Sequence, residues 1–209
     1  MSGYELALLW FAWVLAGASP GPATLGIAGT SMTQGRRAGV IFALGILCGG
    51  AFWGIAAALG MSAVMVANVW VFEILRYAGA AYLLYLAVKS LRSALRRRAP
   101  LAPLSKGAVA AGRIFAKGAL IHLTNPKAII SWGAVYAIAL PAGSAPADLL
   151  WLFGFLYSGG IVVFLGYAVA FSSARVVAAY TRLRRWFEGG FALLFGAAGI
   201  KILTARIVP

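Results

Sequence analysis

The chain has 209 residues, of which 63% are hydrophobic and only 11% charged, and its mean hydropathy is +0.92. These values exclude an ordinary soluble globular domain and indicate an integral membrane protein. The formal net charge of +14 would suggest nucleic-acid binding in a soluble protein, but the basic residues cluster between apolar segments. We therefore expect a lipid bilayer around the chain and no nucleic-acid partner, with the basic residues near anionic lipid headgroups.

Apolar segments recur along the chain at about 20 residues each, the length of helix that crosses roughly 30 Å of hydrocarbon. They lack the alternation over about ten residues that is typical of outer-membrane strands. The sequence therefore predicts an all-α membrane fold with six transmembrane helices. We place these spans at 4–33, 38–60, 70–92, 117–140, 148–172 and 187–206.

The first predicted span is interrupted near its middle by Ser19-Pro20-Gly21-Pro22. Proline removes a backbone donor and collides with the carbonyl four residues earlier, so the helix should open and leave backbone groups without their usual partners. In hydrocarbon such groups are tolerated only where protein or a water-filled cavity meets them. Because Ser19 and Thr24 add hydroxyl groups, we expect this break to form part of a substrate site.

The fourth predicted span has a matching break at Asn125-Pro126-Lys127. Counted from Lys117, Lys127 lies roughly 15 Å deep, near the bilayer centre. A lysine there costs on the order of 2.5–3.5 kcal/mol on insertion scales and is a functional candidate that should face the bundle interior. Its ammonium group either binds a substrate carboxylate, braces carbonyls released by Pro22 and Pro126, or reaches an interface.

Many secondary carriers build their substrate site near the midplane of the bilayer from two broken spans of this kind. A helix N-terminus that opens at a break presents free N–H groups to a carboxylate, whereas freed carbonyls and hydroxyls suit an ammonium group. The two breaks together could therefore bind a zwitterion. The simpler alternative is that the prolines only kink the helices, since proline is frequent in membrane spans.

His122 lies four residues before Pro126 and on the same helical face. It is a candidate proton relay because the ordinary pKa of imidazole lies near physiological pH, the alternative being a hydrogen-bonded neutral ring. No Asp or Glu falls in the middle of a predicted span, which leaves a carboxylate relay without residues. Metal-ligand clusters, paired carboxylates, phosphate loops and catalytic triads are also missing, so we predict no catalytic residue, no metal, no cofactor and no enzyme activity.

Lys and Arg concentrate in the connections after the first, third and fifth predicted spans. By the positive-inside rule these connections are cytoplasmic, so both termini should face outward. The residues are Arg36, Arg37, Arg92, Arg96, Arg97, Arg98, Lys106, Arg113, Lys117, Arg175, Arg182, Arg184 and Arg185.

The longest connection, residues 93–116, is basic and contains prolines. We expect it to be a cytoplasmic linker between a first three-span half, 1–92, and a second, 117–209. Three spans is an odd number, so a second half that repeats the first would have the inverted orientation common among carriers. The segments 85–91 and 197–203 resemble each other modestly, each with a lysine near a helix end, and chance similarity between apolar helices is the alternative explanation.

Four motifs in this order resemble the lysine exporter superfamily, and within it the homoserine/threonine resistance transporters. The resemblance covers nearly the whole chain and implies a multi-pass carrier of the bacterial inner membrane that exports amino acids or close derivatives. We therefore expect a secondary exporter with alternating access, the alternatives being a passive pore or a subunit that depends on a partner. The motifs are Ser19-Pro20-Gly21-Pro22, Gly35-Arg36-Arg37-Ala38-Gly39, Gly79-Ala80-Ala81-Tyr82-Leu83-Leu84-Tyr85-Leu86 and Asn125-Pro126-Lys127-Ala128.

Overall fold

The computed structural model describes residues 2–67, 69–95, 109–140 and 144–204, and in these ranges the chain forms helices and turns without a strand. The predicted all-α class is therefore confirmed for this part of the chain. Its helices are α1 (Gly3–Ala18), α2 (Pro22–Ala67), α3 (Val69–Leu95), α4 (Ala111–Leu123), α5 (Pro126–Ala139), α6 (Pro146–Ala170) and α7 (Ala174–Thr204).

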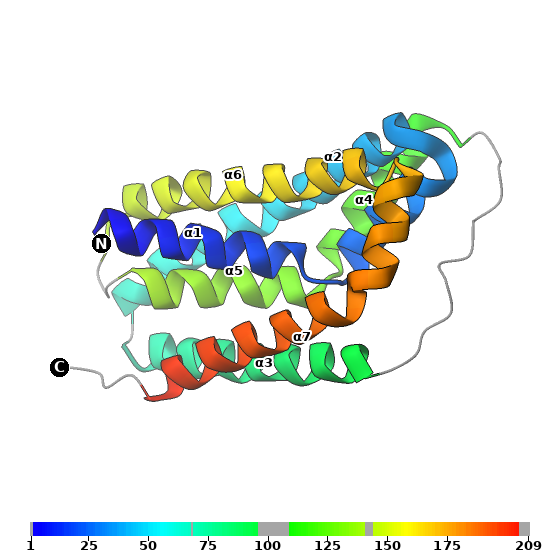
Figure 1. Cartoon of the computed structure of the whole chain (residues 1–209). Helices are drawn as coiled ribbons and strands as arrows, with labels where there is room; N and C mark the ends of the chain where they lie inside the picture. Colours follow the sequence, from blue (N-terminus) through cyan, green and yellow to red (C-terminus); the bar gives the residue numbers. More distant parts are fainter. Residues whose placement is uncertain (1, 68, 96–108, 141–143, 205–209) are drawn as a thin grey trace.

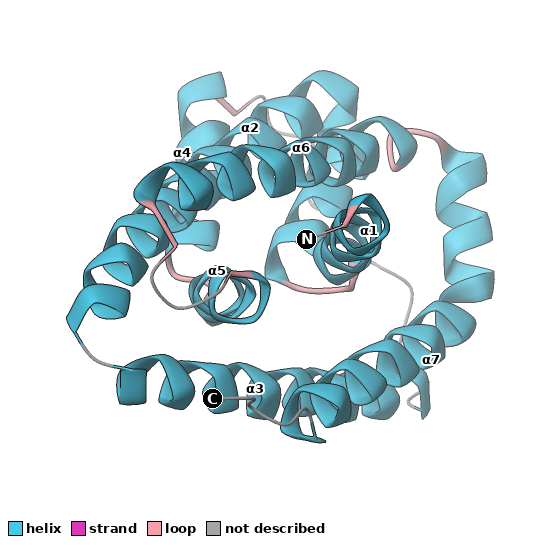
Figure 2. Ribbon diagram, turned by 90° about the vertical axis from the view of Figure 1, so that its left-hand side faces the viewer, coloured by secondary structure: helices cyan, strands magenta, loops and turns pink. Residues whose placement is uncertain are grey.

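The helices are arranged in layers around α1 and α5. Figure 2 shows these two helices end-on, between a layer of α2, α4 and α6 and a layer of α3 and α7. The closest packing is within the outer layers, where α2 contacts α4 and α6 while α3 contacts α7. The start of α1 and the end of α7 lie at the same end of the molecule (Figure 1).

The breaks predicted at the two proline motifs are present. One helix ends at Ala18 before α2 begins at Pro22, and another ends at Leu123 before α5 begins at Pro126. At about 1.5 Å per residue, neither the 16 residues of α1 nor the 14 of α5 reach across roughly 30 Å of hydrocarbon. Among the described residues, only Pro22–Gly60 and α6 are long and apolar enough to do so alone, which is consistent with a helical membrane protein.

Several element boundaries differ from the prediction. The connection expected at 34–37 is a kink within α2, where Gly35 has φ 85°, a left-handed conformation that favours glycine. The connection expected at 173–186 is mostly the first half of α7. Hydropathy detects only the apolar part of a helix, whereas residues such as Ala, Leu and Arg continue a helix beyond the hydrocarbon. The sixth expected span is therefore part of a longer helix.

The linker expected at 93–116 is also partly helical. Ser93 to Leu95 end α3, Ala111 to Ala116 begin α4, and residues 96–108 lie outside the described part of the chain. The second half therefore begins its helix six residues before the expected start at Lys117.

Glycines bring α2 and α4 into backbone contact beside the site. A Cβ atom on Gly45 would lie 2.2 Å from the carbonyl oxygen of Phe115, and one on Gly118 would lie 2.3 Å from that of Phe42. Side chains cannot relieve such contacts because the obstructing atoms belong to the backbone. Small residues of this kind let membrane helices approach closely, and this contact carries His122 against α2, where Gly49 leaves room for it.

Candidate functional site

Lys127 joins the two helix breaks. It is the second residue of α5, and its Nζ donates a hydrogen bond of 2.7 Å to the carbonyl oxygen of Ala16. The same ammonium group is bonded to the hydroxyl of Ser19 and lies 3.4 Å from the Ser19 carbonyl oxygen. These acceptors belong to the C-terminal end of α1, where the helix dipole also favours a positive charge. Lys127 thus contacts carbonyl oxygens beside the first break, and its binding of a substrate carboxylate stays a prediction.

Asn125 caps the N-terminus of α5. Its Oδ1 accepts a hydrogen bond of 3.1 Å from the backbone N–H of Lys127, and its carbonyl oxygen accepts one of 3.0 Å from Ala128 N–H. Pro126 occupies the first helical position and has no N–H to offer. The expectation that a helix N-terminus opens toward a carboxylate therefore does not apply to α5, because its first donors are already occupied.

At the N-terminus of α2 that expectation stays a prediction. Ala23 and Thr24 occupy its second and third positions, where backbone N–H groups have no acceptor within the helix, and both border the internal cavity described below. The Thr24 hydroxyl accepts a hydrogen bond of 3.0 Å from Gly21 N–H and lies 3.3 Å from the carbonyl oxygens of Ser19 and Gly21. Ser19 and Thr24 are buried.

Two further side chains satisfy carbonyl groups released at the breaks. The hydroxyl of Tyr167 donates a hydrogen bond of 2.6 Å to the carbonyl oxygen of Ala18, at the end of α1. The indole N–H of Trp53 donates one of 3.0 Å to the carbonyl oxygen of Leu123, at the end of α4. The sequence analysis missed both residues because nothing in their local sequence shows that they face a break.

A cavity of about 70 Å³ lies between the two breaks. This is several times the roughly 10–15 Å³ that one water molecule needs. Trp13 and Trp132 pack against each other in its wall, with their ring planes tilted by 54° and their centroids 4.5 Å apart. Pro20 and Pro22 do not border the cavity, although the sequence placed them in the site. The predicted residues that do border it are Ser19, Gly21, Thr24, His122, Asn125 and Lys127.

His122 lies in the cavity wall on α4. Its ring packs edge-on against Phe164 at 5.7 Å between ring centroids, and the residue is 7% exposed. Within the described part of the chain, its Nδ1 atom is buried without a hydrogen-bond partner. The structure thus shows no hydrogen bond at Nδ1, and both the relay role and the hydrogen-bonded neutral ring stay predictions.

Glu188 is a buried carboxylate that the sequence analysis overlooked. The predicted sixth span began at 187, so Glu188 was placed at a span end, whereas α7 begins at Ala174 and carries it mid-helix. The residue is 3% exposed, and its Oε1 accepts a hydrogen bond of 2.7 Å from the hydroxyl of Ser93. The sequence analysis placed no Asp or Glu in the middle of a predicted span, whereas Glu188 lies in the middle of the observed helix α7.

Interrupted helices that meet beside a cavity, here joined by the partly buried Lys127, are typical of membrane carriers. The family model of LysE type translocators matches residues 14–206, and the chain belongs to this family, whose members are transporters and not enzymes.

Similar proteins include amino-acid exporters. The chain is 30% identical over 189 residues to the threonine efflux protein of Escherichia coli K12, covering 90% of this chain and 92% of that protein. It is 32% identical over 194 residues to an uncharacterised membrane protein of Pseudomonas aeruginosa, covering 90% and 89%. A leucine efflux protein of Salmonella choleraesuis is 36% identical over 111 residues, 53% of this chain and 51% of that protein. No solved structure matches significantly.

Proposed function

We propose that this protein is a secondary transporter that exports amino acids, or close derivatives, across the bacterial inner membrane by alternating access. Membership of the translocator family and similarity to threonine and leucine efflux proteins support the substrate class. The observation that carries the proposal is the contact of Lys127 with Ala16 and Ser19, because it places one ammonium group between two interrupted helices at a cavity.

In this proposal the substrate carboxylate binds between Lys127 and the N-terminus of α2. The N–H groups of Ala23 and Thr24 and the positive end of the helix dipole favour an anion there. The substrate's ammonium group would meet the oxygens of Ser19, Thr24 and Asn125.

Substrate binding would also change the contacts of Lys127. An ammonium group has three donors, and here they face Ala16 and Ser19 at the end of α1. A substrate carboxylate that takes one of these donors would loosen the end of α1. This exchange is a direct way for a bound amino acid to favour movement of the two halves against each other.

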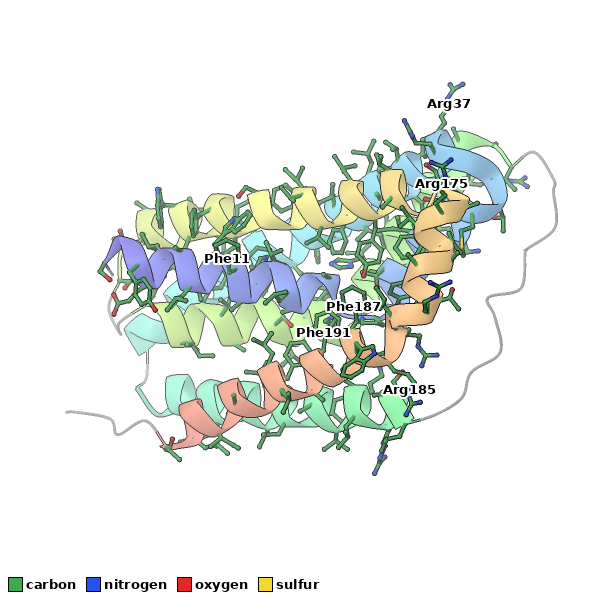
Figure 3. The ribbon with its side chains drawn as sticks, in the orientation of Figure 1. Phe11, Arg37, Arg175, Arg185, Phe187 and Phe191 are labelled. Atoms are coloured by element: carbon green, nitrogen blue, oxygen red, sulfur yellow. The ribbon has the colours of Figure 1, made fainter. Side chains whose placement is uncertain are left out.

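The arrangement of helices supports six spans in two inverted halves. In this proposal α1 continues into α2 as far as Gly35 to form the first span, the rest of α2 is the second, and α3 is the third. In the second half, α4 with α5, then α6, then α7 are the corresponding spans. Figure 3 shows Arg37, Arg175 and Arg185 at the end opposite to the N-terminus, so the cytoplasm would lie at the arginine-bearing end.

A liposome experiment tests the proposed function. Purified protein is reconstituted with a mixture of amino acids inside, and their loss is followed with and without a pH gradient. We expect saturable, selective loss of one or a few amino acids and counterflow when the same amino acid is added outside. Non-saturable loss of all solutes would identify a pore, and no loss would indicate a subunit that depends on a partner.

The Lys127→Ala variant tests the site in the same assay. We expect export to fall by at least about tenfold, the consequence of losing one charge-assisted contact. Lys117→Ala is the matched control, since Lys117 is an exposed lysine on α4 and should not affect transport. Normal export by a correctly inserted Lys127→Ala variant would contradict the assigned role of Lys127.

A further inference from the structure

A second, larger hollow lies on the other side of the first helix break. It is a groove of about 720 Å³ between the Ser19–Pro22 break and the α3/α7 layer, and Glu188 of α7 lies in its wall. Its size falls within the range of about 300–1,000 Å³ that is common for small-molecule sites. Ser19 and Gly21 border both this groove and the cavity beside Lys127, so the break is the wall between them.

Charged side chains of both signs line this groove. The buried carboxylate of Glu188 is the anionic group, and the exposed Lys89 and Arg92 of α3 are the cationic ones. Glu188 lies in the middle of α7, the helix that bends in Figure 1 between its first and second halves. The residues of α3 in this wall lie toward its C-terminal end, on the arginine-bearing side of the molecule.

We infer that this groove is an entrance site for the exported amino acid, in which Glu188 binds the α-ammonium group before the substrate passes the Ser19–Gly21 break. The inference rests on the proposed export function. A buried carboxylate attracts a cation more strongly than an exposed one because the local dielectric is low. Lys89 and Arg92 suit the carboxylate of the same ligand, so a zwitterion fits the groove better than a simple cation.

Glu188 also contributes to a contact between α7 and α3. Its Oε1 accepts from Ser93, while the Arg184 guanidinium donates to the Ser93 hydroxyl at 2.9 Å and lies 3.9 Å from Glu188. Arg185 donates to the carbonyl oxygen of Ala94 at 3.2 Å. These bonds fasten the end of α3 to α7, so a test has to separate the charge of Glu188 from its hydrogen bond to Ser93.

Glu188→Gln makes this separation, because the amide oxygen still accepts from Ser93 while the negative charge is lost. The probes are radiolabelled L-threonine in proteoliposomes and 2,3-dihydroxybutanoate as a competitor, the analogue with a hydroxyl in place of the α-ammonium group. We expect Glu188→Gln to raise the half-saturating concentration of L-threonine by about tenfold or more. Inhibition by the hydroxy acid, which has no ammonium group, should change by less than about twofold.

Ser93→Ala is the control for the structural contact, since it removes the hydrogen bond and keeps the charge. We expect its half-saturating concentration for L-threonine to stay within about twofold of the wild type. The inference is overturned if Glu188→Gln leaves threonine transport unchanged, if it weakens both probes equally, or if Ser93→Ala reproduces its effect. If the wild-type protein itself transports no amino acid, the proposed export function fails as well. If only the variants behave differently from the expectation, the entrance-site inference fails alone.

A second pair of variants decides the question if Glu188→Gln does not fold. Val88 is 48% exposed and lines the groove, while Leu91, 50% exposed on the same helix, does not border it. We expect Val88→Trp to obstruct the groove and abolish most threonine export, and Leu91→Trp to leave it near the wild-type rate. Equal export by the two variants would overturn the assignment of the groove as an entrance.

Discussion

The helix breaks are held by individual side chains from distant parts of the sequence. The carbonyl oxygen of Ala18 accepts from Tyr167, that of Leu123 accepts from Trp53, and that of Ala16 accepts from Lys127. A carbonyl group left bare in a low-dielectric interior is costly, so each of these bonds stabilises an opened helix end. Lys127 differs from the other two because a charged ligand can compete for its donors.

Removing the Tyr167 hydroxyl should destabilise the protein. In Tyr167→Phe the Ala18 carbonyl oxygen loses its donor, and the expected loss is about 1–3 kcal/mol in the free energy of unfolding. Thermal unfolding in detergent measures the change. Tyr4→Phe is the control, since Tyr4 is 73% exposed, and its unfolding temperature should not move. Equal melting of Tyr167→Phe and wild type would show that the Ala18 carbonyl does not depend on this bond.

At the scale of elements, backbone contact between α2 and α4 determines where the second break lies. Gly45 and Gly118 allow the two helices to touch, and His122 then lies against Gly49 and Gly50. α4 is followed directly by the break and by Lys127, so its position on α2 sets the position of the ammonium group. Glycines that look like general packing residues in the sequence therefore position the site.

Gly118→Ala should disturb this contact. The added Cβ would lie 2.3 Å from the carbonyl oxygen of Phe42, and the helices would have to separate. We expect a loss of about 1–3 kcal/mol in unfolding free energy, typical of overpacking, together with reduced export. Gly112→Ala on the same helix has open space around its Cβ and should be neutral or stabilising by up to about 1 kcal/mol. A Gly118→Ala protein as stable as Gly112→Ala would contradict the close approach.

At the scale of the whole molecule, the arginine-bearing end, the groove and the cavity beside Lys127 follow one another in that order. Arg37, Arg175 and Arg185 lie at the end opposite to the N-terminus (Figure 3). The groove lies near the arginine-bearing end of α3, and the cavity beside Lys127 follows beyond the break. In an exporter, a substrate that enters at the arginine-bearing end would reach the groove first and the cavity beside Lys127 second.

The proposed topology can be tested by thiol labelling. Cys48 is the only cysteine of the sequence and is exposed, so it is first replaced by alanine. Ser2→Cys should then react with a membrane-impermeant maleimide on intact spheroplasts, and Arg37→Cys only after permeabilisation. The opposite pattern would place both termini in the cytoplasm and reverse the direction assigned to the groove.

Much of the fold could be predicted because its signals are local. Long apolar segments predict helices in lipid, and Pro22 and Pro126 end the preceding helices wherever those helices pack. Helix ends were predicted less well, because the basic first half of α7 is helical without being apolar. That error concealed Glu188, which was taken for a residue at a span end.

The sequence by itself determined the helical class, the two breaks and the presence of a lysine, because backbone chemistry and hydropathy act over a few neighbouring residues. Only the tertiary structure decided that Lys127 meets Ala16 and Ser19, that Tyr167 and Trp53 satisfy the opened ends, and that Glu188 faces the groove. The physical reason is distance along the chain: Lys127 and Ser19 are separated by 108 residues, and the packing of several helices brings them into contact.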